Sequence, residues 1–406
     1  MAAPEEPGLR PALRTWFQPP RPHGTVVDGR VVSPLELFYD LVFVVFVSEV
    51  AHALAAHPDA TGVRSFVVLF TVLWFAWFNG TSYQDLHGSD DGRSRTYMFV
   101  QMGFVSLLAV YAGHAPDRAH DGRVFGGLLA AFIAWMAYQW WVVRQQDDPE
   151  SAAITTPYFA GLAAIFAAAV ASAFVASNDL RVLLWATGAA LAIVLPMFAR
   201  LGDHQAALDR AFQLSSSMVE RFGLLTIIVL GEVIVGIVGG LSSAEHTTAT
   251  TTVGLLCLLV SFGIWWTYFD FAGQRPPRPR TSTRVLWLVT HLPLTMAVAA
   301  TGAGMVSLIE HAGEERTPAG TSWLVGGAVA VLCLSEAALM RLTERRPGVR
   351  LVPAGLVLAA AVALLAAALR PEPWLLATVL VGALTAVWVE SFVRHARLGQ
   401  QFLEEG

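Results

Sequence analysis

The feature that most constrains this chain is a series of apolar windows, each about 20 residues long and poor in charge. A helix of about 20 apolar residues crosses a hydrocarbon core of about 30 Å. Because lipid offers the backbone no hydrogen-bond partner, such windows must be helices rather than open strands. We count twelve, at residues 34–55, 62–82, 96–113, 124–143, 155–176, 180–199, 219–241, 251–272, 284–309, 322–341, 351–369 and 373–393. The sequence therefore predicts an all-α polytopic membrane protein with about twelve transmembrane helices.

The composition agrees with this prediction and argues against several other classes of protein. The chain is 55% hydrophobic and 14% charged, whereas a soluble domain carries about 25% charged residues. The net charge is −5 and the basic residues are scattered over the connections, so we expect the lipid bilayer as a partner and no nucleic acid. Both cysteines, Cys257 and Cys333, fall in apolar windows. We therefore expect no disulfide, metal or cofactor.

The arginines predict the orientation of the chain. Nineteen lie at one set of predicted helix ends and six at the other, with Arg221 left inside the seventh window. Loops rich in arginine stay in the cytoplasm, so both termini are expected to be cytoplasmic. No secretory signal precedes the first window. The predicted domains are a tail (1–33), a first helical half (34–200), a linker (201–218), a second helical half (219–395) and a C-terminal tail (396–406).

The two halves match each other in order. The segment that starts at Glu36 recurs 184 residues later as the segment Glu220–Glu232, and Gln139 is matched by Glu336 at an offset of 197. Slowly drifting offsets are typical of loop insertions between two copies. Six helices per copy make the repeat parallel, as in some transporters. We therefore predict two parallel six-helix repeats with a central site near the first and seventh helices. The alternative is a duplication that serves packing only.

Two carboxylates are predicted to lie deep in the hydrocarbon. Glu49 lies in the first window with His52 one turn later, and Glu232 lies about 18 Å of helix beyond Glu220 in the seventh window. A charged side chain at the bilayer centre costs about 2.5–3.5 kcal/mol on insertion scales. Desolvated acids of this kind bind cations or relay protons, so we predict Glu232 and Glu49 as ion- or proton-binding residues. For Glu49, a place at the outer interface is the alternative.

Asp270 and His291 are predicted to support the same site. Asp270 follows an aromatic stretch late in the eighth window, and His291 comes two residues before Pro293, which should bend the ninth helix. A histidine beside several acids is able to carry protons. The alternatives are an aromatic belt with a polar end for Asp270 and a packed, satisfied histidine.

Three further acids lie near predicted cytoplasmic helix ends. Glu36 and Asp40 are four residues apart and share one helix face, and Glu220 begins the seventh window. As functional residues they would bind the same cation or proton. As structural residues they would cap a helix start and pair with arginines. The sequence leaves both interpretations open.

Two acid–arginine pairs follow helices that end on the arginine-rich side. Glu390 and Arg394 are four residues apart, which suits a salt bridge along one helix face. Glu336 and Arg341 are five residues apart. We predict both as structural ion pairs, with a functional role as the alternative.

Four motifs carry a resemblance to a known family. The segments Ser33–Val44, Glu220–Glu232, Trp266–Asp270 and His291–Pro293 resemble the signature of the bacterial low temperature requirement protein A (LtrA) family. The resemblance implies a multi-pass protein of the bacterial inner membrane and brings no substrate or reaction. The matched positions without assigned roles are Glu36, Asp40, Glu220, Glu232, Asp270 and His291.

The sequence favours a secondary transporter or an ion- or proton-coupled permease, with intramembrane carboxylates at a central site. One alternative is a membrane-embedded enzyme or assembly factor that acts on lipid or envelope precursors, with the acids as general acid–base groups. A further alternative is a non-catalytic scaffold or a sensor for cold adaptation. The sequence favours a protein that is not an enzyme. It does not decide whether the protein forms a homo-oligomer.

Overall fold

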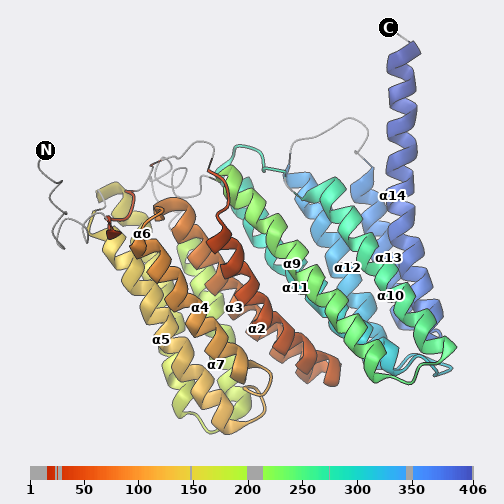
Figure 1. Cartoon of the computed structure of the whole chain (residues 1–406), viewed down its shortest axis with the longest axis horizontal. Coiled ribbons are helices and arrows are strands. Elements are labelled where there is room, and N and C mark those ends of the chain that lie inside the picture. The colour runs from red at the N-terminus through yellow and green to blue at the C-terminus, as the bar shows by residue number, and fades with distance from the viewer. Residues whose placement is uncertain are drawn as a thin grey trace, which may run out of the picture. The chain divides into compact units, whose positions relative to one another are not determined.

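The computed structural model describes residues 16–22, 25, 30–146, 149–198, 214–273, 275–343 and 351–404. Within these ranges the chain folds into twelve α-helices of 18 residues or more and one short π-helix, without a named strand (Figure 1). The α-helices are α2 (Pro34–Ala56), α3 (Ala60–His87), α4 (Gly92–Ala112), α5 (Ala119–Arg144), α6 (Pro149–Phe174), α7 (Asn178–Phe198), α9 (Ser216–Ser243), α10 (Thr248–Thr267), α11 (Thr281–Glu310), α12 (Ala319–Leu342), α13 (Val352–Leu369) and α14 (Pro373–Glu404). The π-helix η2 (Tyr268–Ala272) continues α10.

Each of the twelve predicted windows falls on one of these helices, so the all-helical prediction is confirmed. Within the described ranges, eleven helices are long and apolar enough to cross a membrane. The remaining long helix is α4, which carries Arg93 and Arg95 in its first turn and Gln101 further along. Its polar residues lower its hydropathy without preventing a helix.

Local sequence explains where several helices begin and end. At the start of α2 the Ser33 hydroxyl accepts the Glu36 backbone N–H (3.3 Å), while the Glu36 carboxylate accepts the Ser33 N–H (2.9 Å). This reciprocal capping box satisfies two backbone donors that a helix start leaves free. Asp91 caps α4 by accepting the Ser94 N–H at 3.0 Å. Arg370 ends α13 in the left-handed conformation, with φ of 53°.

The chain divides into two compact units. Unit 1 consists of residues 1–46 and 71–218, and unit 2 consists of residues 47–70 and 219–406. The hairpin of α2 and α3 contributes to both, since its connection and the adjoining turns belong to unit 2. These units are groups of contacts, whereas the predicted halves are groups of similar sequence, so the two divisions do not test each other.

In unit 1, consecutive helices from α4 to α7 lie beside one another. Their core is aromatic: Phe125 of α5 and Trp185 of α7 are both fully buried and meet edge to face, with ring centroids 4.9 Å apart. Phe132 and Phe104 stack at 5.5 Å between α5 and α4. Large rings at these positions fill the space between helices that small residues would leave open.

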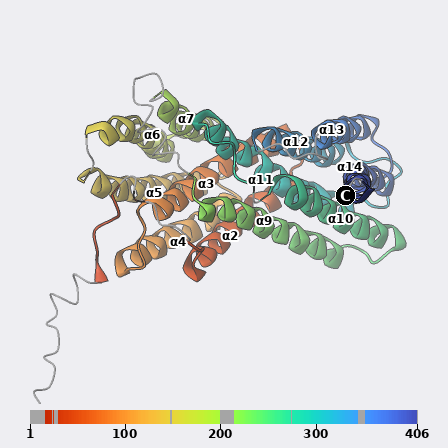
Figure 2. The same ribbon diagram turned by 90° about the horizontal axis from the view of Figure 1, so that it is seen from above.

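In unit 2, α11, α12, α13 and α14 neighbour one another in order, and α10 lies beside α14 and α11 (Figure 2). The contact between α12 and α13 depends on small residues. A Cβ on Gly326 would come within 2.7 Å of the Ala363 backbone carbonyl and the Ala367 methyl group. Close approach through glycine and alanine is the usual way in which membrane helices pack, because lipid removes the hydrophobic drive between them.

Candidate functional site

Glu232 lies at the centre of a polar cluster inside unit 2. It sits about 24 Å along α9 and is half-buried. The Ser48 hydroxyl, from α2, donates to Glu232 Oε1 at 2.6 Å. His52, one turn further along α2, places Nδ1 3.4 Å from the same hydroxyl. The three residues form a chain from the imidazole through the hydroxyl to the carboxylate. Because the Ser48 proton is donated to Glu232, the contact with His52 is a hydrogen bond when Nδ1 carries the proton.

A small cavity of about 20 Å³ lies beside this cluster. Its polar lining comes from His52 and Glu232, and its walls are small or apolar, including Ala51, Gly236 and Gly302. A cavity must offer roughly 10–15 Å³ to hold a water molecule. The site therefore has room for one water molecule or one dehydrated cation beside a carboxylate.

The structure does not bring Glu49 into this cluster. Glu49 is exposed, and the cavity is lined by residues 47, 51, 52 and 55 of α2 instead. Successive helix residues point about 100° apart, so the neighbour of an inward-facing residue faces away. The inward position in α2 is Ser48, which the sequence analysis did not single out.

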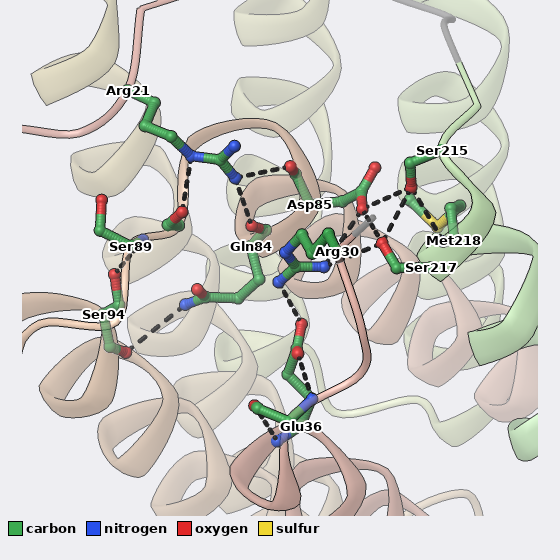
Figure 3. A network of polar contacts seen from close by, with 12 residues as sticks. Arg21, Arg30, Glu36, Gln84, Asp85, Ser89, Ser94, Ser215, Ser217 and Met218 are labelled. Atoms are coloured by element: carbon green, nitrogen blue, oxygen red, sulfur yellow. Dashed lines mark hydrogen bonds and ion pairs between the residues drawn. The ribbon is translucent and has the colours of Figure 1, made fainter. Parts of the chain in front are cut away.

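Glu36 belongs to a different network, at the start of α2 in unit 1 (Figure 3). Arg30 Nη2 lies 2.6 Å from Glu36 Oε1, and Arg30 Nη1 lies 3.2 Å from Asp85 Oδ1 at the end of α3. Both carboxylates are buried. Glu36 therefore takes the structural arrangement weighed above: it caps its own helix and pairs with an arginine.

Asp85 is a buried acid at the centre of this network, and the sequence analysis did not single it out. Its Oδ1 accepts from the hydroxyls of Ser215 and Ser217, both at 2.6 Å, as well as from Arg30 (Figure 3). Ser215 and Ser217 bracket the start of α9, about 130 residues away in sequence. Arg30 and Glu36 are six residues apart, so their contact is local in the sequence. The contact of Arg30 with Asp85 joins residues 55 positions apart and could not be predicted from the sequence.

Arg21 fastens the segment before α2 to the end of α3. Its guanidinium donates to the carbonyl oxygens of Gly88 (2.7 Å) and Asp85 (2.8 Å), and its backbone N–H donates to that of His87 (3.1 Å). Burial, and then the neighbouring Arg30, lower the pKa of Arg21, while Asp85 and Glu36 raise it. An arginine remains charged under such a shift, so this contact holds the segment at all ordinary pH values.

Asp40 is fully buried in unit 1, where Trp77 Nε1 donates to its Oδ1 at 2.7 Å. One residue earlier, the Tyr39 hydroxyl donates to Gln101 Oε1 at 2.6 Å, and Gln101 Nε2 donates to Gln139 Oε1 at 2.8 Å. This buried chain crosses three helices through neutral groups. The sequence did not reveal these contacts, because they join residues 62 and 38 positions apart.

His291 is fully buried in unit 2 and contacts aromatic rings. Its ring centroid lies 4.1 Å from that of Trp287 and 4.5 Å from that of Phe222. Its Nδ1 lies 2.8 Å from the Trp287 carbonyl oxygen, which makes Nδ1 the protonated nitrogen. Nε2 has no hydrogen-bond partner within the described part of the chain. Among the described contacts of His291, none reaches Glu232.

Asp270 lies in η2 and is exposed. Trp388 Nε1, from α14, donates to its Oδ2 at 3.0 Å, and Arg275 donates to its backbone carbonyl. Glu220, near the start of α9, is half-buried. Neither residue lines the cavity beside Glu232, so the site predicted from the sequence is spread over separate places in the structure.

Of the two predicted ion pairs, one is not formed and the other is not tested. Glu336 is fully buried and lies 3.2 Å from the Thr267 hydroxyl, whereas Arg341 is exposed, and no described ion pair joins the two. Five residues correspond to about 140° of helix rotation, which explains why they diverge. Glu390 is exposed and lies against Gly355 of α13. The side chain of Arg394 lies outside the described residues, so that pair stays a prediction.

The described residues contain no group of three or more His, Cys, Asp or Glu side chains that would hold a metal ion. Many apolar helices with polar groups buried between them define a class: a multi-pass α-helical membrane protein.

Within that class, the model of the bacterial low temperature requirement A protein (LtrA) family matches residues 31–389, and the chain belongs to this family. A protein of Rhizobium meliloti (strain 1021), Uncharacterized protein RA0937, is 27% identical over 312 residues, which cover 70% of this chain and 71% of the relative. No solved structure matches the chain.

Proposed function

We propose that the protein is an ion- or proton-coupled permease of the inner membrane in which Glu232 binds the transported or coupling cation. The observation that carries this proposal is the contact between Ser48 Oγ and Glu232 Oε1, 2.6 Å long, at the edge of a cavity with room for one water molecule. A half-buried carboxylate with a hydroxyl donor and open space beside it suits a small cation.

The repeat predicted from the sequence supports the same proposal. Ser48 and Glu232 are 184 residues apart, which is the offset between the two copies of the first-helix motif. Equivalent residues of two copies touch only where the copies meet on their common axis. In parallel-repeat transporters the substrate site lies at such a place, near the middle of the membrane.

The order of groups from His52 through Ser48 to Glu232 provides a route for a proton. A hydroxyl accepts a proton from one side and donates one to the other, so Ser48 is able to pass a proton between the imidazole and the carboxylate. The enzyme alternative has weaker support. Glu36 and Asp40, which it would use at the interface, already bind Arg30 and Trp77.

The test is flux into liposomes that contain the purified protein and an internal pH dye, with gradients of H⁺, Na⁺ and K⁺ applied in turn. We expect flux of at least one cation, loss of that flux in Glu232→Gln, and retention in the matched control Glu49→Gln, whose carboxylate is exposed. Ser48→Ala removes a hydrogen bond to a charged group, which costs about 1.5–3 kcal/mol, or roughly 10- to 150-fold in affinity.

Two outcomes would contradict the proposal. Absence of flux for every cation would favour the scaffold or sensor alternative. Flux that persists in Glu232→Gln and disappears in Glu49→Gln would place the site on the exposed face of α2 instead.

A further inference from the structure

Glu336 is a buried carboxyl group outside the Glu232 cluster. It lies in the second half of α12, is 0% exposed, and is absent from the lining of the cavity beside Glu232. Its Oε1 lies 3.2 Å from Thr267 Oγ1, at the end of α10, and its Oε2 has no hydrogen-bond partner within the described chain. No described arginine lies within ion-pair distance of it. A carboxylate in such a place would be a desolvated charge without a counter-charge.

The Thr267 hydroxyl contacts two acceptors. Its Oγ1 is 3.2 Å from the Ile264 carbonyl oxygen, which also accepts the Tyr268 backbone N–H, and 3.2 Å from Glu336 Oε1. A hydroxyl has one proton to donate. A carbonyl oxygen and a carboxylate oxygen both only accept, so the hydroxyl serves one of the two unless Glu336 is itself a donor. A carboxylic acid at position 336 satisfies both contacts, whereas a carboxylate leaves one of them unmade.

The described groups around Glu336 do not supply a positive charge. The Tyr268 hydroxyl of η2 and the Cys333 thiol, one turn earlier on α12, are the titratable groups that interact with it. On α11, His291 contacts the ring of Tyr268, and its Nδ1 lies 2.8 Å from the Trp287 carbonyl oxygen. α13 contains no ionisable residue, and the described side chains of α14 contribute the exposed acid Glu390. None of these groups is a cation that would hold a carboxylate.

The corresponding position in the first half carries the neutral analogue. Gln139 matches Glu336 at the offset of 197 and is also fully buried. Its Oε1 accepts from Gln101 at 2.8 Å. An amide has the shape of a carboxylic acid and no charge, so both copies accept a neutral planar group at this depth.

We propose that Glu336 is a proton-binding site buried in unit 2, occupied by a proton that the carboxylic acid donates to Thr267. The site uses none of the residues assigned to cation binding, so it stands or falls independently of the permease function. Its ligand is the proton itself, because the Glu336 side chain is 0% exposed and lines neither of the described cavities.

The test is infrared spectroscopy of the intact protein in lipid nanodiscs at neutral pH, with glutamate labelled by ¹³C to identify its carbonyl bands. We expect a protonated-carboxyl band at the high-frequency end of its range, since Oε2 accepts no hydrogen bond. The band should be lost in Glu336→Gln and kept in Glu310→Gln, an exposed acid at the end of α11. A wild-type spectrum without such a band, or a band unchanged by Glu336→Gln, would overturn the proposal.

Thr267→Val provides a second measurement that does not depend on whether Glu336→Gln folds. It removes the Thr267 hydroxyl, which accepts the proton of the Glu336 carboxylic acid, but keeps the shape of the side chain. We expect the Glu336 band to shift in frequency while remaining present. A band that does not move in Thr267→Val would show that the acid does not donate to this hydroxyl.

Discussion

The buried and half-buried carboxylates of unit 1 and unit 2 are held by different partners. In unit 1, Glu36 and Asp85 share Arg30, and Asp40 accepts from Trp77. In unit 2, Glu232 and Glu336 meet hydroxyls, from Ser48 and Thr267, and no described arginine pairs with either. A buried acid with a cation is stable as a carboxylate and is costly to disturb. One that meets only a hydroxyl is able to gain or lose a proton or to bind a cation.

The partners of these acids separate those that hold the fold together from those that are available for function. The unit 1 network joins the segment before α2, the end of α3 and the start of α9, so its charges hold chain segments together. Each unit 2 acid joins two helices through a single described hydrogen bond. Glu336 Oε2 has no described hydrogen-bond partner, and Glu232 lies beside a cavity. The experiments that follow test this contrast, in order of expected effect.

The largest effect is expected from Arg30→Ala. The substitution leaves Glu36 and Asp85 buried without their shared cation, and breaking a buried pair costs about 3–5 kcal/mol. Because the Arg30 side chain is 17% exposed, we expect about 3 kcal/mol, measured as a lowered apparent melting temperature in detergent. The control Arg95→Ala breaks the exposed pair with Asp90, for which less than about 1 kcal/mol is expected. Equal effects in the two variants would contradict a structural role for the Arg30 network.

Trp77→Phe is expected to have the next largest effect. It removes the donor to Asp40, and losing a hydrogen bond to a buried charged group costs about 1.5–3 kcal/mol. Trp388→Phe removes the same kind of contact from Asp270, which is exposed to solvent or headgroups and finds a new donor there. We expect the melting temperature to fall in the first variant and to change little in the second. The reverse order would show that burial does not decide the strength of this contact.

Glu336→Gln is expected to have the smallest effect on stability. If the acid is neutral, the amide replaces it with nearly the same shape, and the change should stay below about 1 kcal/mol. The same substitution at Glu36 removes the charge that Arg30 needs and should cost about 1.5–3 kcal/mol. Thermal unfolding of the two variants side by side compares the units directly. A larger loss at position 336 than at position 36 would contradict the contrast drawn here.

Much of the fold was readable from the sequence. All twelve predicted windows lie on helices, because length and hydropathy are local properties of about 20 residues and lipid leaves the backbone no other choice. The helix start at Ser33 and Glu36 was readable for the same reason, since a capping box is a local pattern.

The candidate site was only partly readable. Glu232 was selected because a deep carboxylate is costly, but its partner Ser48 carries no charge and gave no such signal. Glu49 was selected for its charge and proved to face outward. Arg341 was predicted to pair with Glu336 because the two are close in sequence. They point in different directions from α12, and the Thr267 hydroxyl contacts Glu336 instead.

The sequence alone determined that this chain is a membrane protein of the LtrA family with acids inside apolar windows of both halves, because hydropathy, charge and motif are written along a single chain. Only the tertiary structure decided which acids meet an arginine and which meet a hydroxyl. Those partners lie between 37 and 184 residues from the acids they bind, except for Arg30 and Glu36. A contact between distant residues depends on how helices rotate and pack against one another, which no local pattern records.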